Sequence, residues 1–296
     1  MSEISAKIVM DLRARTNAGM MDCKKALAEA GGDMEKAEEI LRKKGITKME
    51  KRTDRVSKEG MINALLSSCG KTGVLVEVNC ETDFVAKNEG WRGFVSELTE
   101  HTLASVADSL DALLAEPYTK GKGSVDEAVK AKGAETGEVT LLRRFTRFAA
   151  GESSAVATYL HMGGRIGVMV EVEAGKAETL SADAFKTLLK DLTMHIAAAN
   201  PEFLNRSDVP ADVVEKERAI YAESDRLKGK PAAAMEGILN GMLNKFYSQV
   251  CLLEQGFIKD PDQSISDLVA ATGKALGDTL TVKRFARFAV GEELKA

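Results

Sequence analysis

The segment VNCETDFVAKNEG, residues 78–90, places an acid and two bulky apolar residues directly after a strand-like run. Asp83 brings a carboxylate, which can bind a metal ion or a basic group. Phe84 and Val85 bring apolar surface, which gains free energy only when it is buried. Two interpretations of Phe84 are open: it is the first core residue of the next helix, or it enters another molecule.

Few other residues are of a type and spacing that could catalyse a reaction or bind a metal ion. The chain has three histidines, and its four cysteines show no CxxC spacing, which favours reduced thiols over a zinc site. CGKTG at 69–73 is similar to the end of a phosphate loop, but the required first glycine is missing and a strand follows. No Ser/His/Asp grouping or acidic pair stands out. Met20 and Met21 cannot both face inward easily, so one of them is expected to contact a partner.

Three short helices are predicted over residues 1–45. Asp33 can cap the third, which we expect to stop at Gly45. The segment KKGITKMEKRTDRVSK, residues 43–58, holds seven Lys/Arg against two acids. We interpret it as a solvated basic linker that isolates the helical bundle from the rest of the chain.

The remainder of the chain contains a repeat. GVLVEVN (73–79) and GVMVEVE (167–173) match at an offset of 94 residues. An apolar helix face repeats at the same offset and predicts an amphipathic helix in each half. The first face holds Trp91, Phe94, Val95, Leu98 and Thr102, and the second holds Phe185, Leu188, Leu189, Leu192 and Ile196. His101 and His195 occupy equivalent positions, which indicates shared packing more than metal binding.

A second match closes each half. RRFTRFAAGE (143–152) and KRFARFAVGE (283–292) are separated by 140 residues, so the second half holds about 46 more residues than the first. These lie in 211–256, which is typical of two helices joined at 228–231. Each half is then strand, strand, helix, variable segment and strand, an α+β unit with a small antiparallel sheet.

The predicted fold is therefore α+β, with a helical bundle followed by two repeated subdomains. The expected parts are residues 1–52 with the linker to about 58, then 59–152, then 153–296 with a helical insertion at 211–254. At the offset of 94 residues Phe84 falls opposite Glu178, in the loop-like segment 175–182, so the second half needs no apolar residue at that position. Thr82–Asn88 is therefore predicted to be a separate turn, capped by Thr82 or Asp83. An unbroken helix to Trp91 would instead put Phe84 in the core.

Composition places limits on the function. Apolar residues at 44% and charged residues at 29% describe a soluble globular protein, with no apolar run long enough to span a membrane. The N-terminal residues lack the features of a signal peptide, and we expect a cytoplasmic protein. A net charge of −4 argues against a general nucleic-acid binder.

Four segments resemble the signatures of the elongation factor Ts family, in order and over essentially the whole chain. They are LRARTNAGMMDCKKAL (12–27), VNCETDFVAKN (78–88), HMGGRIGV (161–168) and MHIAAANPEFL (194–204). Members of this family are guanine-nucleotide exchange factors for the GTPase elongation factor Tu. The resemblance implies a ubiquitin-associated-like N-terminal bundle, two repeated core subdomains, and a coiled-coil hairpin inserted in the second.

The resemblance also implies the site. In the family, the pair matching Asp83 and Phe84 approaches the Mg²⁺ and phosphate region of the partner, and the aromatic ring enters between partner side chains. Thr82 and Val85 flank this exchange wedge. The protein would hold no metal of its own. Further partner-binding positions implied by the resemblance are Arg13, Met20, Met21, Lys24, His161, Gly164, Phe257 and Ile258.

The predicted function is that of an exchange factor without catalytic residues or cofactor. It would disturb the Mg²⁺ and phosphate site of elongation factor Tu and promote GDP release, so that GTP can bind. No direct nucleic-acid or membrane partner is expected, and a homodimer of the heterodimer through the core or the hairpin stays open. The alternative is a non-exchange adaptor or chaperone whose N-terminal bundle binds a ubiquitin-like or ribosome-associated partner. An enzyme built on His101, His195 and the cysteines is a third, more distant alternative.

Overall fold

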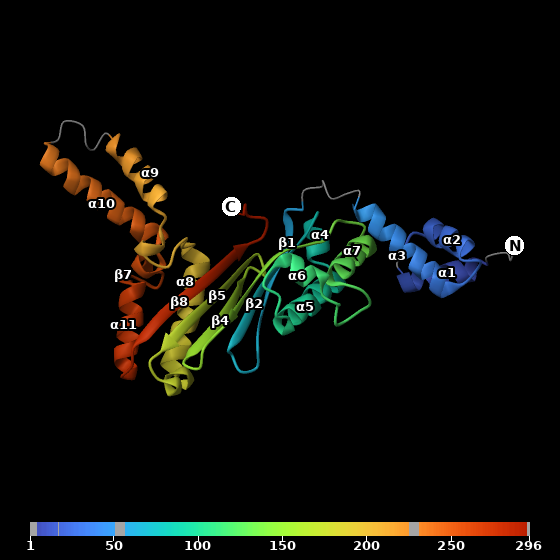
Figure 1. Ribbon diagram of the computed structural model, residues 1–296, viewed down its shortest axis with the longest axis horizontal. Coiled ribbons are helices and arrows are strands. Elements are labelled where there is room, and N and C mark those ends of the chain that lie inside the picture. Colours follow the sequence, from blue (N-terminus) through green and yellow to red (C-terminus); the bar gives the residue numbers. More distant parts are fainter. Residues whose placement is uncertain (1–4, 17, 51–56, 225–230, 295–296) are drawn as a thin grey trace.

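The computed structural model describes residues 5–16, 18–50, 57–224 and 231–294. Figure 1 shows an elongated molecule, with the N-terminal helices at one end, sheets in the middle and a pair of helices projecting at the other end. The sheets are small and antiparallel, and helices pack on them, so the predicted α+β fold is confirmed. Within the described ranges, no helix is both long and apolar enough to cross a membrane.

The N-terminal bundle consists of α1 (Ala6–Thr16), α2 (Met20–Glu29) and α3 (Met34–Glu50). Its small core is made of residues from all three helices. These are Val9, Leu12, Cys23, Ala26, Leu27 and Ala37. Asp33 caps α3 as predicted, because its Oδ1 accepts a hydrogen bond from the Lys36 N–H (3.1 Å).

The predicted end of the third helix is wrong. α3 continues through Gly45 to Glu50, so the first part of the basic segment is helical, and residues 51–56 of that segment lie outside the described residues. α3 also lies against α7 (Val125–Thr136), as Figure 1 shows. Glycine inside a helix is unfavourable by only about 1 kcal/mol, so contact with a neighbouring helix can override it. The bundle therefore touches the next unit instead of being isolated from it.

The first sheet has the strand order β1-β2-β3. Its strands are β1 (Glu59–Leu66), β2 (Thr72–Cys80) and β3 (Leu141–Ala149). Four helices connect β2 to β3, namely α4 (Asp83–Ala86), α5 (Glu89–Ala104), α6 (Leu110–Ala115) and α7. The predicted stripe of α5, from Trp91 to Leu98, is buried against Val76 and Val78 of β2. The amphipathic helix expected from the repeat is confirmed.

The second sheet repeats this plan with the order β4-β5-β8. Its strands are β4 (Ser154–His161), β5 (Ile166–Ala174) and β8 (Leu280–Ala289), with α8 (Asp183–Ala199) in the place of α5. The shorter elements around them are η1 (Ala177–Ser181), η2 (Arg206–Asp208), η3 (Leu252–Glu254), β6 (Gly256–Phe257), β7 (Asp260–Ser264) and α11 (Ile265–Leu276). The predicted succession of two strands, a helix and a closing strand is confirmed in both halves.

The additional residues of the second half form the projecting pair of helices, α9 (Ala211–Ala222) and α10 (Ala232–Val250). Of the predicted joint at 228–231, residues 228–230 lie outside the described residues. Arg206 fastens the base of the pair, because its guanidinium bonds Asn244 and Glu254 and stacks on Tyr247 (4.6 Å). Leu252 is fully buried, so the last part of the predicted insertion belongs to the core.

The two sheets face each other through reciprocal contacts. Arg144 of the first half stacks on Phe288 of the second (3.9 Å), and Arg284 of the second stacks on Phe148 of the first (4.2 Å). Within each pair of equivalent residues the offset is the 140 residues found in the sequence. The halves therefore pack with a local two-fold relation, as the subunits of a symmetric dimer do.

Candidate partner-binding surface

Phe84 lies on the short helix α4 and is 81% exposed. Thr82 caps this helix by accepting a hydrogen bond from the Val85 N–H (3.5 Å), and Asn88 then caps α5 separately. Val85 and Ala86 pack on the core of the first half. The break between α4 and α5 thus turns the ring outward. The predicted separate turn is confirmed, and the interpretation of Phe84 as a core residue is wrong.

Two carboxylates hold α4 against the sheet. Glu138, in the loop between α7 and β3, accepts hydrogen bonds from the Thr82 N–H (3.0 Å) and from the Thr82 hydroxyl (2.6 Å). In the opposite direction, Glu81 accepts one from the Val139 N–H (2.9 Å). These bonds link the end of β2 to the start of β3. They give the exposed aromatic ring a fixed support, which limits the conformational entropy lost on binding.

Asp83 stands in the first turn of α4, where its carboxylate pairs with Lys87 (2.6 Å). The hydrogen bond from Lys87 lowers the pKa of Asp83 below its ordinary value, so the carboxylate is ionised at neutral pH. Both side chains are exposed to solvent, and such pairs contribute little to stability. Asp83 can therefore exchange Lys87 for a cation or donor of another molecule at little cost.

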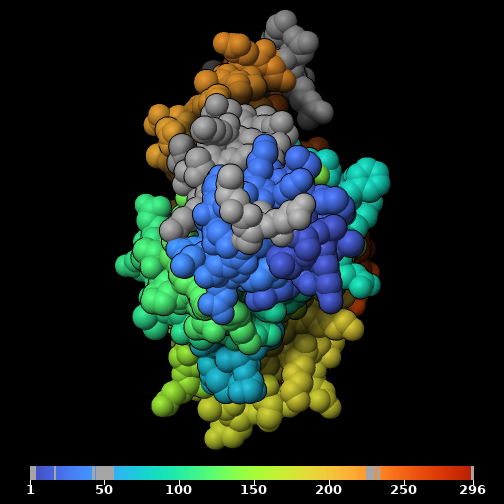
Figure 2. Space-filling view, turned by 90° about the vertical axis from the view of Figure 1, so that its right-hand side faces the viewer, coloured from blue at the N-terminus to red at the C-terminus, as the bar shows by residue number. Residues whose placement is uncertain are grey.

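The four candidate residues of the N-terminal bundle are all exposed. They are Arg13 on α1 and Met20, Met21 and Lys24 on α2. Met20 is 49% and Met21 64% exposed, so both methionines face outward where only one was expected to do so. Figure 2 looks at the molecule from this end and shows the described residues of the bundle, in blue, at the front.

The turn between β4 and β5 contains two candidate residues, of which one is exposed and one is buried. His161 is exposed and its Nδ1 lies 3.1 Å from the Tyr159 hydroxyl. Gly164 is buried, and its carbonyl accepts a hydrogen bond from the Ile62 N–H (2.7 Å). A Cβ at Gly164 would lie 2.7 Å from the Ile62 carbonyl oxygen, so only glycine fits. Gly164 joins the two sheets, and its burial does not support a direct contact with a partner.

Met162, in the same turn, was missed by the sequence reasoning. It is 71% exposed and has a positive φ of 49°, which is uncommon for a residue other than glycine. The signal was present in the sequence, because a methionine stands before two glycines where a hairpin turn usually has polar residues. Both α4 and this turn adjoin β1, and each carries an exposed apolar residue, Phe84 and Met162.

The last candidate pair separates into a buried and an exposed residue. Phe257 is 5% exposed and belongs to the core of the second half. Ile258 follows the two-residue strand β6 and is 40% exposed. Of the two, Ile258 therefore offers its side chain to a partner, and the side-chain contact predicted for Phe257 is not supported.

The exposed candidates are spread along the length of the molecule. α4 and the turn at 161–165 adjoin β1, whereas α1 and α2 lie near one end of the molecule and the β6–β7 segment near the base of the projecting helices (Figure 1). Such a distribution suits contact with a macromolecule more than with a small ligand.

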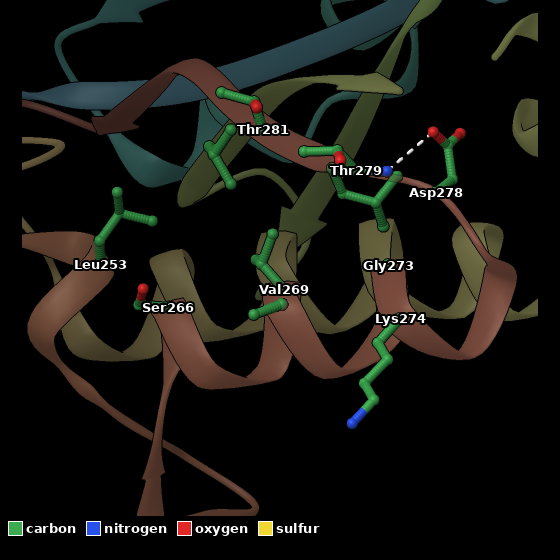
Figure 3. Close-up of a pocket in the computed structure, with 11 residues that line it drawn as sticks. Leu253, Ser266, Val269, Gly273, Lys274, Asp278, Thr279 and Thr281 are labelled. Atoms are coloured by element: carbon green, nitrogen blue, oxygen red, sulfur yellow. Dashed lines mark hydrogen bonds between the residues drawn. The ribbon is translucent and has the colours of Figure 1, made fainter. Parts of the chain in front are cut away.

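A cavity of about 410 Å³ lies elsewhere, between α11 and β8 (Figure 3). Val269 and Leu280 contribute apolar surface to it, and the Lys274 side chain points away from it. Asp278 on its wall accepts hydrogen bonds from the Thr179 hydroxyl (2.5 Å) and the Thr279 N–H (2.7 Å). The Asp278 carboxylate is thus engaged in holding neighbouring loop residues together.

Two of the three histidines, and the cysteines Cys80 and Cys251, lie in the interior. His101 and His195 are both buried, at equivalent positions of α5 and α8, in agreement with the repeat. Burial raises the pKa of Cys80 to about 12 and that of Cys251 to about 11, which makes both thiols poor nucleophiles. Among the described residues, no cluster of three or more His, Cys, Asp or Glu side chains is arranged to hold a metal ion.

Comparisons with known proteins agree with this architecture. The family model described as "Elongation factor TS" matches residues 81–292. The chain is 45% identical to elongation factor Ts of Trichlorobacter lovleyi over 99% of its own length and 94% of that protein. It is 44% identical to the protein of that name from Syntrophotalea carbinolica, with 99% and 95% covered, and 43% identical to that of Nitratiruptor sp., with 99% and 94% covered. The chain therefore belongs to the elongation factor Ts family.

Proposed function

We propose that the chain is the guanine-nucleotide exchange factor of elongation factor Tu in cytoplasmic protein synthesis. It makes and breaks no covalent bond and uses no metal or cofactor of its own. Family membership favours this role over that of a non-exchange adaptor or chaperone. The negative net charge of −4 supports a protein partner in place of nucleic acid.

The observation that carries this proposal is the exposed ring of Phe84 on a helix fixed by Glu138. A phenylalanine that is 81% exposed contributes little to the stability of the free protein, but it can bury a large apolar area in a partner. Its neighbour Asp83 is ionised and exposed. An aromatic group beside a carboxylate on one rigid turn can displace partner side chains and draw away a cationic ligand.

Exchange follows from thermodynamic linkage. If factor and nucleotide each weaken the other's binding to the GTPase, the two effects must be equal in free energy. The Mg²⁺ of a GTPase bridges the nucleotide phosphates to the protein, so disturbance of this site weakens the binding of the nucleotide. We assign this disturbance to Phe84 as the wedge and to Asp83 as the group that acts on the metal ligands. GTP then rebinds and the factor leaves.

The other exposed candidates extend the contact. Residues 1–52 form a recruiting unit that binds through Arg13, Met20, Met21 and Lys24. His161 and Ile258 contribute from the second half, and a pair of such complexes can associate through the core or the projecting helices. The exposure of these side chains supports the assignment.

The experiment that tests the proposal is release of a fluorescent GDP from elongation factor Tu, followed by stopped flow with excess unlabelled GDP. We expect the protein to accelerate release, with a rate that rises with its concentration. Added Mg²⁺ should reduce the acceleration, because it favours the occupied site. Binding of elongation factor Tu without any acceleration of release would support the adaptor function and overturn the exchange function.

A further inference from the structure

The segment that carries Ile258 is held by two contacts from one helix. The Ile258 N–H donates a hydrogen bond to His195 Nδ1 of α8 (3.3 Å). The ammonium of Lys259 pairs with Asp191 of the same helix (2.7 Å). Asp191 and His195 are four residues apart and so lie on one face of α8. The backbone N–H of Ile258 and the side chain of the next residue are therefore both bound to a core helix.

The first contact requires one form of the ring. A nitrogen that accepts a backbone N–H must carry a lone pair, so the proton of neutral His195 is on Nε2. The Nε2–H donates this proton in a hydrogen bond to Gln255 Oε1, and the distance between Nε2 and Oε1 is 2.9 Å. Burial lowers the pKa of His195 and keeps the ring neutral. Both ring nitrogens are thus satisfied, and Phe257 packs beside the ring.

The first half contains the same arrangement at the equivalent residue. His101 Nδ1 accepts a hydrogen bond from the Thr119 N–H (3.4 Å), and its Nε2 lies 3.1 Å from Glu116. In each half, a buried histidine of the core helix holds a backbone N–H of a loop that follows. The halves differ in what the loop presents, because Thr119 lies outside the proposed partner-binding surface and Ile258 lies within it.

We infer that His195 is a positioning residue for partner binding, whose Nδ1 fixes the backbone of Ile258 so that this side chain meets elongation factor Tu in one orientation. The inference rests on the proposed function, since Ile258 matters only if it contacts the partner. Without the His195 bond, the Ile258 N–H would be free to move with its loop, and the loop would have to be ordered when the partner binds.

Three variants separate positioning from general destabilisation. His195→Asn places an oxygen near the position of Nδ1 and keeps an acceptor for Ile258. His195→Gln places its amide near Nε2, so it keeps the contact with Gln255 and loses the contact with Ile258. His101→Gln makes the same change in the first half and serves as the matched control. Hydrogen exchange of the Ile258 amide in the free protein is measured together with affinity for nucleotide-free elongation factor Tu.

We expect His195→Gln to expose the Ile258 amide to exchange and to weaken binding about 5- to 10-fold, the scale of one hydrogen bond. His195→Asn should retain protection and affinity, and His101→Gln should bind like wild type. A protected Ile258 amide in His195→Gln would overturn the inference, and so would lost protection with unchanged affinity. If His195→Gln fails to fold, nitrogen-15 NMR of wild type decides, because an Nδ1–H tautomer contradicts the geometry. Failure of wild type itself to bind would instead overturn the proposed function.

Discussion

Replacement of Phe84 by alanine should leave the fold intact and remove most of the exchange activity. Phe84 is 81% exposed, so only about a fifth of its surface is buried. A phenylalanine can bury ~200 Å², so the buried area here is about 40 Å². At ~25 cal/mol per Å² this gives at most about 1 kcal/mol of folding stability. A buried hot-spot aromatic is worth about 2–4 kcal/mol in binding, which is roughly 30- to 700-fold in affinity.

The assay combines thermal unfolding by circular dichroism with fluorescent-GDP release. Phe185→Ala is the core reference, because Phe185 is fully buried on α8 and its truncation should lower stability by about 3–5 kcal/mol. Val106→Ala is the surface control, since Val106 is 85% exposed beyond the far end of α5 and should leave exchange unchanged. A Phe84→Ala protein that melts early, yet releases GDP normally while folded, would refute the assignment of Phe84 as the wedge.

Three further outcomes are expected. Glu138→Ala should remove both bonds to Thr82, lower stability by about 1–3 kcal/mol and slow GDP release. Glu135→Ala, which removes a half-exposed carboxylate paired with Lys132, should do neither, and unchanged release in Glu138→Ala would contradict the role of Glu138 in holding α4. Replacing residues 214–240 by a Gly/Ser loop should preserve the melting transition, and a lost transition would place the outer helices in the core. Glu77 is fully buried and, although burial raises its pKa, the Gly291 N–H and Arg144 lower it overall. Its stabilising contribution is therefore present above about pH 4.5, its ordinary pKa, and is lost as the pH falls further. Glu77→Gln should flatten that acid-side loss of stability in pH-dependent melting, and an equally steep loss would contradict this role.

The local features of the site could be predicted because they depend on neighbouring residues. Thr82 and Asn88 are both good N-caps, and two caps six residues apart predict a break in the helix between them. The second half has no apolar residue opposite Phe84, which indicated that the core does not need one. This missing counterpart and the cap at Thr82 led to the predicted separate turn, and the structure adds Asn88 as the cap of α5.

The remaining features depend on contacts between distant segments. The hydrogen bonds between Glu138 and Thr82 join residues far apart in sequence, and no local sequence pattern predicts them. Gly45 was expected to end a helix, but α3 continues along α7. Phe257 and Ile258 are adjacent and apolar, and only the packing of β6 against the core decides which of them is buried. A strand of two residues is too short to show an alternating sequence pattern, so periodicity cannot predict which residue is buried.

The central claim is that this protein and GDP oppose each other on elongation factor Tu. Its most direct test is the affinity of the protein for elongation factor Tu measured by calorimetry, once without nucleotide and once with saturating GDP and Mg²⁺. We predict much tighter binding of the protein without nucleotide. The ratio of its two affinities should equal the ratio by which the protein lowers the affinity of GDP for elongation factor Tu in a parallel titration. Equal affinity for the two forms of elongation factor Tu would contradict the claim.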